Sequence, residues 1–296
     1  MKIDVVDWKL VGTCNMNCLH CYGPAKNVLA LPLDQLLRIV DTLGKLSVEW
    51  VVLTGGEPLM VPNIETVMKR ITETGAKIGL STNTTYFRTF QRTIEQYVAS
   101  LNIPLDGSTP QIHAKSRGDE ESYDTFFDIL KHYRANHGTK PELLRVGTVF
   151  SRANQGDFIQ LARKLESFAD QIDTWKIYEI IDYDIQQELR SPLIPDPGSF
   201  QPEMDRLLES TPLASKIMLS PANSRDKAYF MVDPKARLVI PENENGVTRE
   251  VPFGNLLSEP LGEIIERWAG RIRAQNYTGN HAHYEKLVKI GDIAEL

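Results

Sequence analysis

The sequence predicts an α/β fold, a partial (β/α)6 TIM-like barrel followed by a C-terminal α/β extension. From the N-terminus to about residue 182, short β-rich runs alternate with segments whose apolar residues recur at helical spacing, the pattern of βα units around a parallel sheet. Six such units occur, whereas a closed barrel needs eight. Beyond residue 182 the alternation ends. We therefore expect a barrel core over residues 1–182 and an extension over residues 183–296.

The predicted strands are short, apolar and rich in β-branched residues, as in buried parallel sheets. They are expected at residues 3–11, 50–53, 77–81, 101–105, 144–150 and 174–180. A helix should follow each of the first five strands, where apolar residues recur every three or four positions. These helices are expected from Asp34 onward and over residues 64–71, 87–98, 123–130 and 158–165. In barrels of this type the reactive residues follow the C-terminal ends of the strands.

The extension shows no βα repeat and is expected to pack on the barrel without forming an independent domain. Prolines at positions 192, 195, 197 and 202 interrupt its first part, so we expect an irregular connection there and not a continuous helix. Its later part should form a hairpin, with strands at residues 228–232 and 237–240, and then an amphipathic helix from Leu261 to Trp268.

Composition argues against some classes of partner. The chain has 33 basic and 39 acidic residues, a net charge of −6, so a polyanion such as nucleic acid is not expected as the main partner. No run approaches the roughly 20 apolar residues that span a bilayer. The N-terminus carries charge where a secretion signal would need an apolar run. We expect a cytoplasmic protein that binds neither membrane nor nucleic acid.

All three cysteines of the chain, Cys14, Cys18 and Cys21, fall within eight positions. Such an odd, clustered set indicates a metal or redox site and not a disulfide framework. A cluster of four irons normally takes four thiolates, so three would leave one iron open to a small molecule. The alternative is a structural zinc site closed by His20. Because His20 and Cys21 are adjacent, joint ligation would be strained, and the spacing favours iron–sulfur over zinc.

Further motifs resemble those of the radical SAM superfamily, whose members use a [4Fe–4S] cluster and S-adenosylmethionine (SAM). The cysteines match the family signature CxxxCxxC, and Gly55-Gly56-Glu57-Pro58 resembles its GGEP segment. Three more matches follow in the family's order: Ser81-Thr82-Asn83, Leu105-Asp106-Gly107, and Gly147-Thr148-Val149 with Asn154. The resemblance covers roughly residues 5–180. It implies reductive cleavage of SAM to a 5′-deoxyadenosyl radical, which abstracts hydrogen from a substrate.

The resemblance also implies which residues bind SAM. They are expected to be Gly55, Gly56, Glu57, Pro58, Thr82, Asn83, Asp106, Ser108 and Val149. The two glycines let the backbone approach a ligand closely, and Glu57 offers an anion to the charged amine of SAM. Pro104 stands where the family often has a serine. A hydroxyl contact is therefore missing or comes from elsewhere, with Ser108 as the candidate.

Substrate specificity should come from the barrel mouth, because the radical would attack almost any nearby C–H bond. Lys176, Tyr178 and Arg117 are the candidate catalytic residues, since they lie in or after strands that point toward this end. A second resemblance is to viperin and its prokaryotic relatives, which have one cluster, a cysteine-poor extension and a Trp-Lys pair like Trp175-Lys176. We expect a small-molecule or nucleotide substrate, and an electron donor such as flavodoxin or ferredoxin.

Two alternatives to this function stay open. The barrel also resembles that of radical SAM enzymes that modify ribosomally made peptides, although this chain has no cysteines for their auxiliary clusters. A non-catalytic metal-binding module is the second alternative. Formation of 5′-deoxyadenosine would distinguish either enzymatic function, on a small molecule or on a peptide, from the non-catalytic metal-binding module.

We predict that Cys18→Ala loses the cluster and all SAM cleavage, because two thiolates are too few to hold four irons. Iron content and 5′-deoxyadenosine formation after anaerobic reconstitution check this, with the unchanged chain as reference. A full iron complement in the variant would refute the assignment of Cys18 as a ligand.

Overall fold

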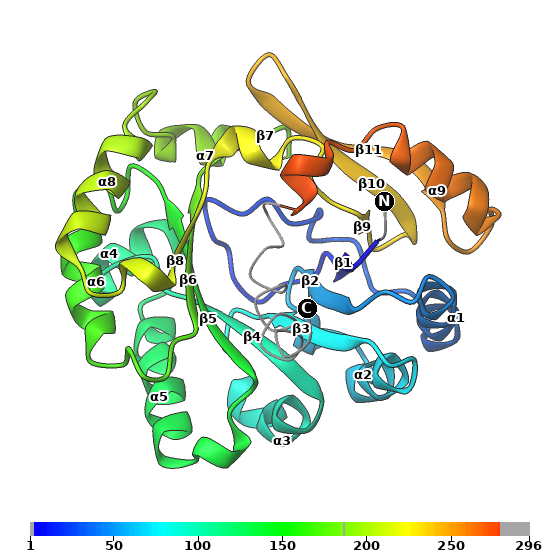
Figure 1. Cartoon of the computed structure of the whole chain (residues 1–296), viewed down its shortest axis with the longest axis horizontal. Helices are drawn as coiled ribbons and strands as arrows, with labels where there is room; N and C mark the ends of the chain where they lie inside the picture. The colour runs from blue at the N-terminus through cyan, green and yellow to red at the C-terminus, as the bar shows by residue number, and fades with distance from the viewer. Residues whose placement is uncertain (1–2, 186, 279–296) are drawn as a thin grey trace, which may run out of the picture.

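The computed structural model describes residues 3–185 and 187–278, and within them it shows a mixed α/β fold with an eleven-stranded sheet. The strand order is β7-β11-β10-β9-β1-β2-β3-β4-β5-β6-β8 (Figure 1). The first six strands pair in parallel with their neighbours in the chain. They are β1 (Val5–Val11), β2 (Trp50–Gly55), β3 (Lys77–Ser81), β4 (Val98–Pro104), β5 (Leu143–Phe150) and β6 (Thr174–Glu179). The predicted partial barrel is confirmed.

Helices cover the outer face of these strands (Figure 1). They are α1 (Leu33–Gly44), α2 (Ile64–Glu73), α3 (Phe87–Tyr97), α4 (Pro110–Arg117), α5 (Glu121–Ala135) and α6 (Phe158–Glu166). The apolar side of α1 belongs to the same buried cluster as Trp8 and Leu10 of β1. The sequence pattern did not predict α4, because this helix has few apolar residues. Its N-terminus is capped by Thr109, whose side chain accepts a hydrogen bond from the Ile112 amide at 3.3 Å.

The inner face of the sheet changes from apolar to polar along the strands. Val5, Val52 and Leu143 belong to a separate buried cluster near the starts of their strands. Successive side chains alternate between the two faces of a strand, so the residue two positions further along points the same way. Those residues are Asp7, Thr54 and Arg145. The interior is therefore apolar at one end and polar toward the C-terminal ends of the strands.

The chain passes directly from one side of the sheet to the other. β6 lies beside the edge strand β8 (Ile217–Ser220), whereas β7 (Asp182–Tyr183) is the opposite edge. Because a residue spans at most about 3.6 Å, Glu179 and Asp182 lie within about 11 Å of each other. This short connection requires the sheet to curl, as Figure 1 shows.

The extension continues the barrel sheet. β9 (Met231–Val232) pairs in parallel with β1, and β10 (Arg237–Glu244) pairs with β9 in the predicted hairpin. The amphipathic helix is also confirmed, as α9 (Leu261–Ala269). The boundary at residue 182 stays a prediction.

Several elements of the extension were not predicted. They are α7 (Gln187–Arg190), α8 (Phe200–Ser210), β8 and β11 (Val247–Asn255). The expectation of an irregular connection was wrong at α8, because Pro202 lies in the first turn, where a helix tolerates proline. Short 3-10 helices complete the description: η1 (Pro58–Met60), η2 (His137–Thr139), η3 (Ser191–Leu193), η4 (Ala214–Lys216) and η5 (Ala222–Arg225).

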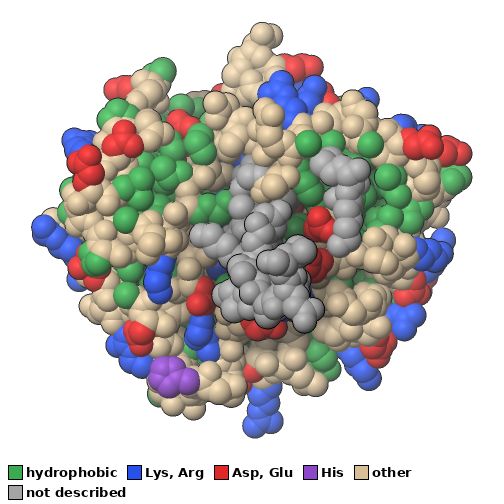
Figure 2. Space-filling model, in the orientation of Figure 1, with side chains coloured by type: hydrophobic (Ala, Val, Ile, Leu, Met, Phe, Trp, Pro, Cys, Tyr) green, Lys and Arg blue, Asp and Glu red, His purple; other side chains and the backbone are tan. Residues whose placement is uncertain are grey.

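The described helices include none with the length and apolarity needed to cross a membrane. On the face shown in Figure 2, acidic and basic side chains alternate around the rim, so the described residues there carry charges of both signs.

We predict that Tyr277→Phe lowers the free energy of unfolding by about 1–3 kcal/mol, the usual cost of leaving buried polar groups unsatisfied. The buried Tyr277 hydroxyl accepts hydrogen bonds from the amides of Asp4 and Val5, both at 2.9 Å, and so ties the extension to β1. Urea unfolding measures the change. Tyr97→Phe is the control, because its hydroxyl accepts from the exposed Gln96 side chain. Equal stability of both variants would contradict this anchoring role.

Candidate active site

The three cysteines follow β1 in a loop that is tied to its surroundings through backbone hydrogen bonds. The Gly12 amide donates to the Val28 carbonyl at 2.8 Å, and the Leu19 amide donates to the Ser116 carbonyl at 2.7 Å. Cys14, Cys18 and Cys21 are free thiols of intermediate exposure, and all three line one cavity. The loop thus presents its thiols to a common space at the C-terminal ends of the strands.

Glycine at position 56 lets the end of β2 lie directly against the cysteine loop. The Gly56 amide donates to the Val11 carbonyl at 2.6 Å, and the next amide donates to the Thr13 carbonyl at 2.9 Å. A Cβ atom at position 56 would lie 2.1 Å from the Thr13 carbonyl oxygen. Gly55 has a φ of 129°, which L side chains rarely adopt. The two glycines therefore line the cavity and also shape its wall.

Glu57 is wholly buried and is used inside the protein. Its carboxylate accepts hydrogen bonds from the Thr82 hydroxyl at 2.8 Å and from the amides of Asn83 at 2.7 Å and Leu59 at 3.1 Å. Burial raises the pKa of this carboxyl to about 7, although the hydrogen bonds oppose the shift. Glu57 thus joins the ends of β2 and β3 and is not among the residues that line the cavity, and its contact with the amine of SAM stays a prediction.

Asn83 extends this connection to the cysteine loop. Its side-chain nitrogen donates to the Asn15 side chain at 2.8 Å and lies 3.6 Å from the Cys14 sulfur. Thr82 and Asn83 both line the cavity of the thiols, as does Val149 from β5. Of the predicted SAM residues, the cavity lining thus includes Gly55, Gly56, Thr82, Asn83 and Val149.

The other predicted SAM residues lie outside this lining. Pro58 is buried in η1, and Ser108 donates its hydroxyl to the Asp157 carboxylate at 2.5 Å. Asp106 is fully buried and accepts from Arg117 Nε at 2.6 Å and from the Val149 amide at 2.7 Å. Although burial acts to raise it, the pKa of Asp106 is lowered overall, mainly by the Arg117 guanidinium. Asp106 therefore supports two residues that do line the cavity.

The thiol loop fits a multinuclear cluster better than a single ion. No three His, Cys, Asp or Glu side chains of residues 3–185 and 187–278 are arranged to ligate one metal ion, which needs its ligands within about 2.3 Å. His20 is the fourth ligand in the zinc alternative, and its Nε2 atom lies 3.9 Å from Oδ2 of Asp106. In a [4Fe–4S] cluster each thiolate binds a different iron, so the sulfurs need not meet at one point. Burial raises the pKa of Cys18 to about 11, and a bound metal ion would favour the thiolate.

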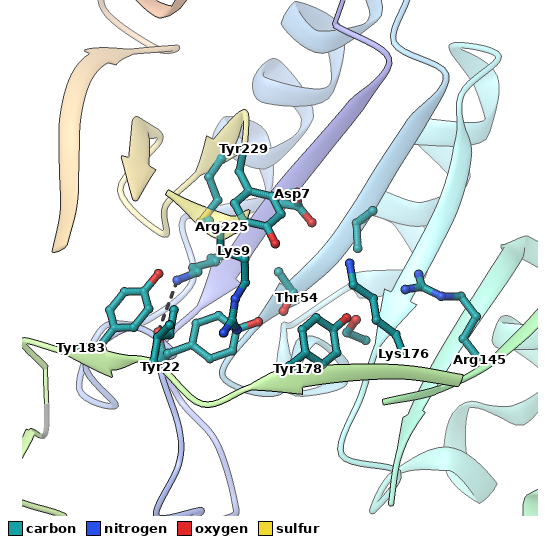
Figure 3. Close-up of a pocket in the computed structure, with 14 residues that line it drawn as sticks. Asp7, Lys9, Tyr22, Thr54, Arg145, Lys176, Tyr178, Tyr183, Arg225 and Tyr229 are labelled. Atoms are coloured by element: carbon teal, nitrogen blue, oxygen red, sulfur yellow. Dashed lines mark hydrogen bonds between the residues drawn. The ribbon is translucent and has the colours of Figure 1, made fainter. Parts of the chain in front are cut away.

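A second cavity lies inside the barrel beside the first (Figure 3). The two share part of their lining: Lys9, Tyr22, Thr54, Ser81, Tyr178, Ile181 and Arg225. The second cavity also contains the side chains of Lys176, Arg145, Tyr229 and Asp7. Of the predicted catalytic residues, Lys176 and Tyr178 lie here, whereas Arg117 lines only the thiol cavity.

Basic side chains outnumber acidic ones in the lining of this second cavity, and one of them, Lys9, is paired with Glu250. The lining has four basic side chains, from Lys9, Arg145, Lys176 and Arg225, and one acidic side chain, from Asp7. Burial, then the nearby Arg145 charge, lowers the pKa of Lys176 well below its ordinary value, while Asp7 acts in the opposite direction. An anion that enters the cavity would therefore favour the charged form of Lys176.

Sequence reasoning missed most residues of the second cavity. Asp7 and Lys9 could have been found, because they are charged and alternate within an otherwise apolar strand. Arg225 and Tyr229 carry no such signal, since they come from an irregular part of the extension and reach the cavity only through the tertiary fold.

Comparison with known proteins places this geometry in a family. The sequence model of the radical SAM superfamily matches residues 8–165, which is more than half of the chain. The chain belongs to the radical SAM superfamily. Members of this superfamily use a [4Fe–4S] cluster and SAM, and they act on small-molecule, nucleotide or peptide substrates.

Individual relatives cover the chain to different extents. It is 27% identical over 119 residues to an AdoMet-dependent heme synthase of Methanosarcina barkeri, which covers 38% of this chain and 34% of the relative. It is 23% identical over 273 residues to an S-adenosylmethionine-dependent nucleotide dehydratase of Selenomonas ruminantium, covering 89% of this chain and 94% of the relative. The fold is similar to that of Streptococcus suis SuiB bound to S-adenosylmethionine, with a TM-score of 0.68, 11% identity, and coverage of 94% of this chain and 68% of SuiB.

We predict that Gly56→Ala weakens SAM binding at least tenfold, because the added methyl group would force β2 away from the Thr13 carbonyl. Equilibrium binding of SAM to the reconstituted protein measures the effect. Gly138→Ala is the matched control, since a Cβ at that position meets no atom within 4 Å. Unchanged SAM affinity in the Gly56 variant would contradict the importance of this close backbone contact.

Proposed function

We propose that this chain cleaves SAM reductively and abstracts a hydrogen atom from a small anionic substrate, most suitably a nucleotide, held in the second cavity. One observation carries the proposal: the cavity lined by the three thiols shares seven residues with a cavity rich in basic and tyrosine side chains. A radical formed in the first cavity would therefore arise next to a substrate in the second.

The residues of the first cavity would hold the cofactors. Cys14, Cys18 and Cys21 would ligate the cluster, and the lining residues of β2, β3 and β5 would contact SAM. When bound, the cluster would supply the single electron for reductive cleavage of SAM, and SAM would supply the radical that abstracts hydrogen from the substrate. Asp106 would orient Arg117, which faces the same cavity, and Glu57 would keep Thr82 and Asn83 in place. We further propose flavodoxin or ferredoxin as the electron donor.

The side chains that line the second cavity suit a nucleotide in charge and in aromatic surface. Arg145, Lys176 and Arg225 can neutralise phosphate oxygens, for which Arg and Lys are the usual partners, whereas Lys9 is already paired with Glu250. Tyr178 and Tyr229 add aromatic surface against which a base can pack. The name of the Selenomonas ruminantium relative, a nucleotide dehydratase, supports the same substrate class.

The direct test is anaerobic turnover of reconstituted protein with reductant, SAM and each nucleoside triphosphate in turn. We expect one nucleotide to accelerate the formation of 5′-deoxyadenosine. When that nucleotide is supplied in deuterated form, deuterium should appear in the 5′-deoxyadenosine. A fully loaded protein that forms no 5′-deoxyadenosine would leave only the metal-binding module. Turnover of a peptide and of no nucleotide would favour the peptide alternative.

We predict that Lys176→Ala raises the KM of the nucleotide about ten- to hundredfold, since a hydrogen bond to a charged group contributes about 1.5–3 kcal/mol. SAM cleavage without substrate should stay within about twofold of the unchanged protein, because Lys176 lies outside the lining of the thiol cavity. Lys164→Ala, on the exposed side of α6, is the control. Equal loss of both activities would show that Lys176 is structural.

A further inference from the structure

Arg190 joins the extension to the cysteine loop. This last residue of α7 is fully buried, and its guanidinium donates to three backbone carbonyls. Nη1 donates to Tyr183 at 2.8 Å, and Nη2 donates to Ile185 at 2.9 Å and to Cys21. The bond to Cys21 connects positions 169 residues apart in the sequence. A side chain of the extension is therefore part of the scaffold of a thiol-bearing residue.

The charge of this guanidinium is not neutralised by a carboxylate in direct contact. None of the salt bridges among the described residues involves Arg190, and its Nε atom is buried without a hydrogen-bond partner. Asp182 and Asp184 act on it only from a longer distance. Carbonyl oxygens satisfy N–H donors but leave the positive charge in place, and a buried charge without a partner is costly. The Cys21 thiol lies on the loop that Arg190 contacts, and it becomes an anion when it ligates a metal.

Aromatic contacts fix this arrangement. The ring of Tyr22, next to Cys21, stacks on that of Tyr183 with a centroid separation of 5.6 Å. The guanidinium of Arg190 lies 5.7 Å from the centre of the Tyr183 ring. Tyr183 itself belongs to β7, which pairs with β11 at the edge of the sheet. Arg190 is thus held in place relative to both the sheet and the cysteine loop.

We propose that Arg190 is a positioning residue that supplies a buried countercharge to the cluster at Cys21. The inference rests on the proposed function, in that Cys21 ligates the cluster. Sulfides and thiolates give a [4Fe–4S] site with three cysteines a net negative charge, which increases when one electron is added from flavodoxin or dithionite. A fixed positive charge and a hydrogen bond close to a ligand stabilise the reduced form and raise the reduction potential. The extension would then set how easily the cluster accepts its electron.

Two substitutions separate the charge of Arg190 from its hydrogen bonds. Arg190→Gln retains N–H donors but removes the charge, and we expect the equilibrium constant for one-electron reduction of the cluster to fall about three- to tenfold. A tenfold fall corresponds to about 59 mV. Arg190→Lys keeps the charge and should stay closer to the unchanged protein. Arg134→Gln, which removes an exposed charge from α5, is the control and should leave the potential unchanged.

A redox titration followed by electron paramagnetic resonance, without SAM or substrate, gives the potential of each variant. Equal potentials in the Gln variant and the unchanged protein, at equal iron content, would overturn the inference. If the Gln variant holds no cluster, the Lys variant decides: restored iron content supports the countercharge, and equal loss of iron overturns it. A protein that shows the expected shift but forms no 5′-deoxyadenosine contradicts the proposed function alone.

Discussion

The close contact between the end of β2 and the start of the cysteine loop is the constraint on which the rest of the site depends. Only glycine can occupy position 56, where the backbone meets the carbonyls of Val11 and Thr13. Glu57 follows at once, and its buried carboxylate holds Thr82 and Asn83 at the end of β3. Two adjacent residues thereby fix the relative positions of two strand ends and the thiol loop.

The extension completes the site, because the sheet curls back on itself. Only two residues separate β6 from β7 on the opposite edge of the sheet. The extension contributes Arg225 and Tyr229 to the lining of the second cavity and Arg190 to the scaffold of Cys21. The second cavity and the support of the cysteine loop are therefore built from both the barrel and the extension.

Sequence reasoning predicted the parts of the fold that are set by local pattern. The six parallel strands, the hairpin at β9 and β10, and the cysteine loop all follow from periodicity or motif. Glu57 shows the limit of prediction from a motif. The motif indicates that a carboxylate is needed, but it does not indicate which groups inside the protein the carboxylate contacts. Ser108 failed to reach the cavity lining for a related reason: its hydroxyl is taken up by Asp157, which lies 49 positions away. Such long-range pairings carry no local signal.

The central claim is that three thiolates hold a cluster whose remaining iron binds SAM. Electron paramagnetic resonance of the reduced, anaerobically reconstituted protein tests it most directly, recorded before and after SAM is added. The account predicts the signal of a reduced [4Fe–4S] cluster that changes in shape when SAM binds. A zinc-loaded protein without that signal, or an iron signal that SAM leaves unaltered, would contradict it.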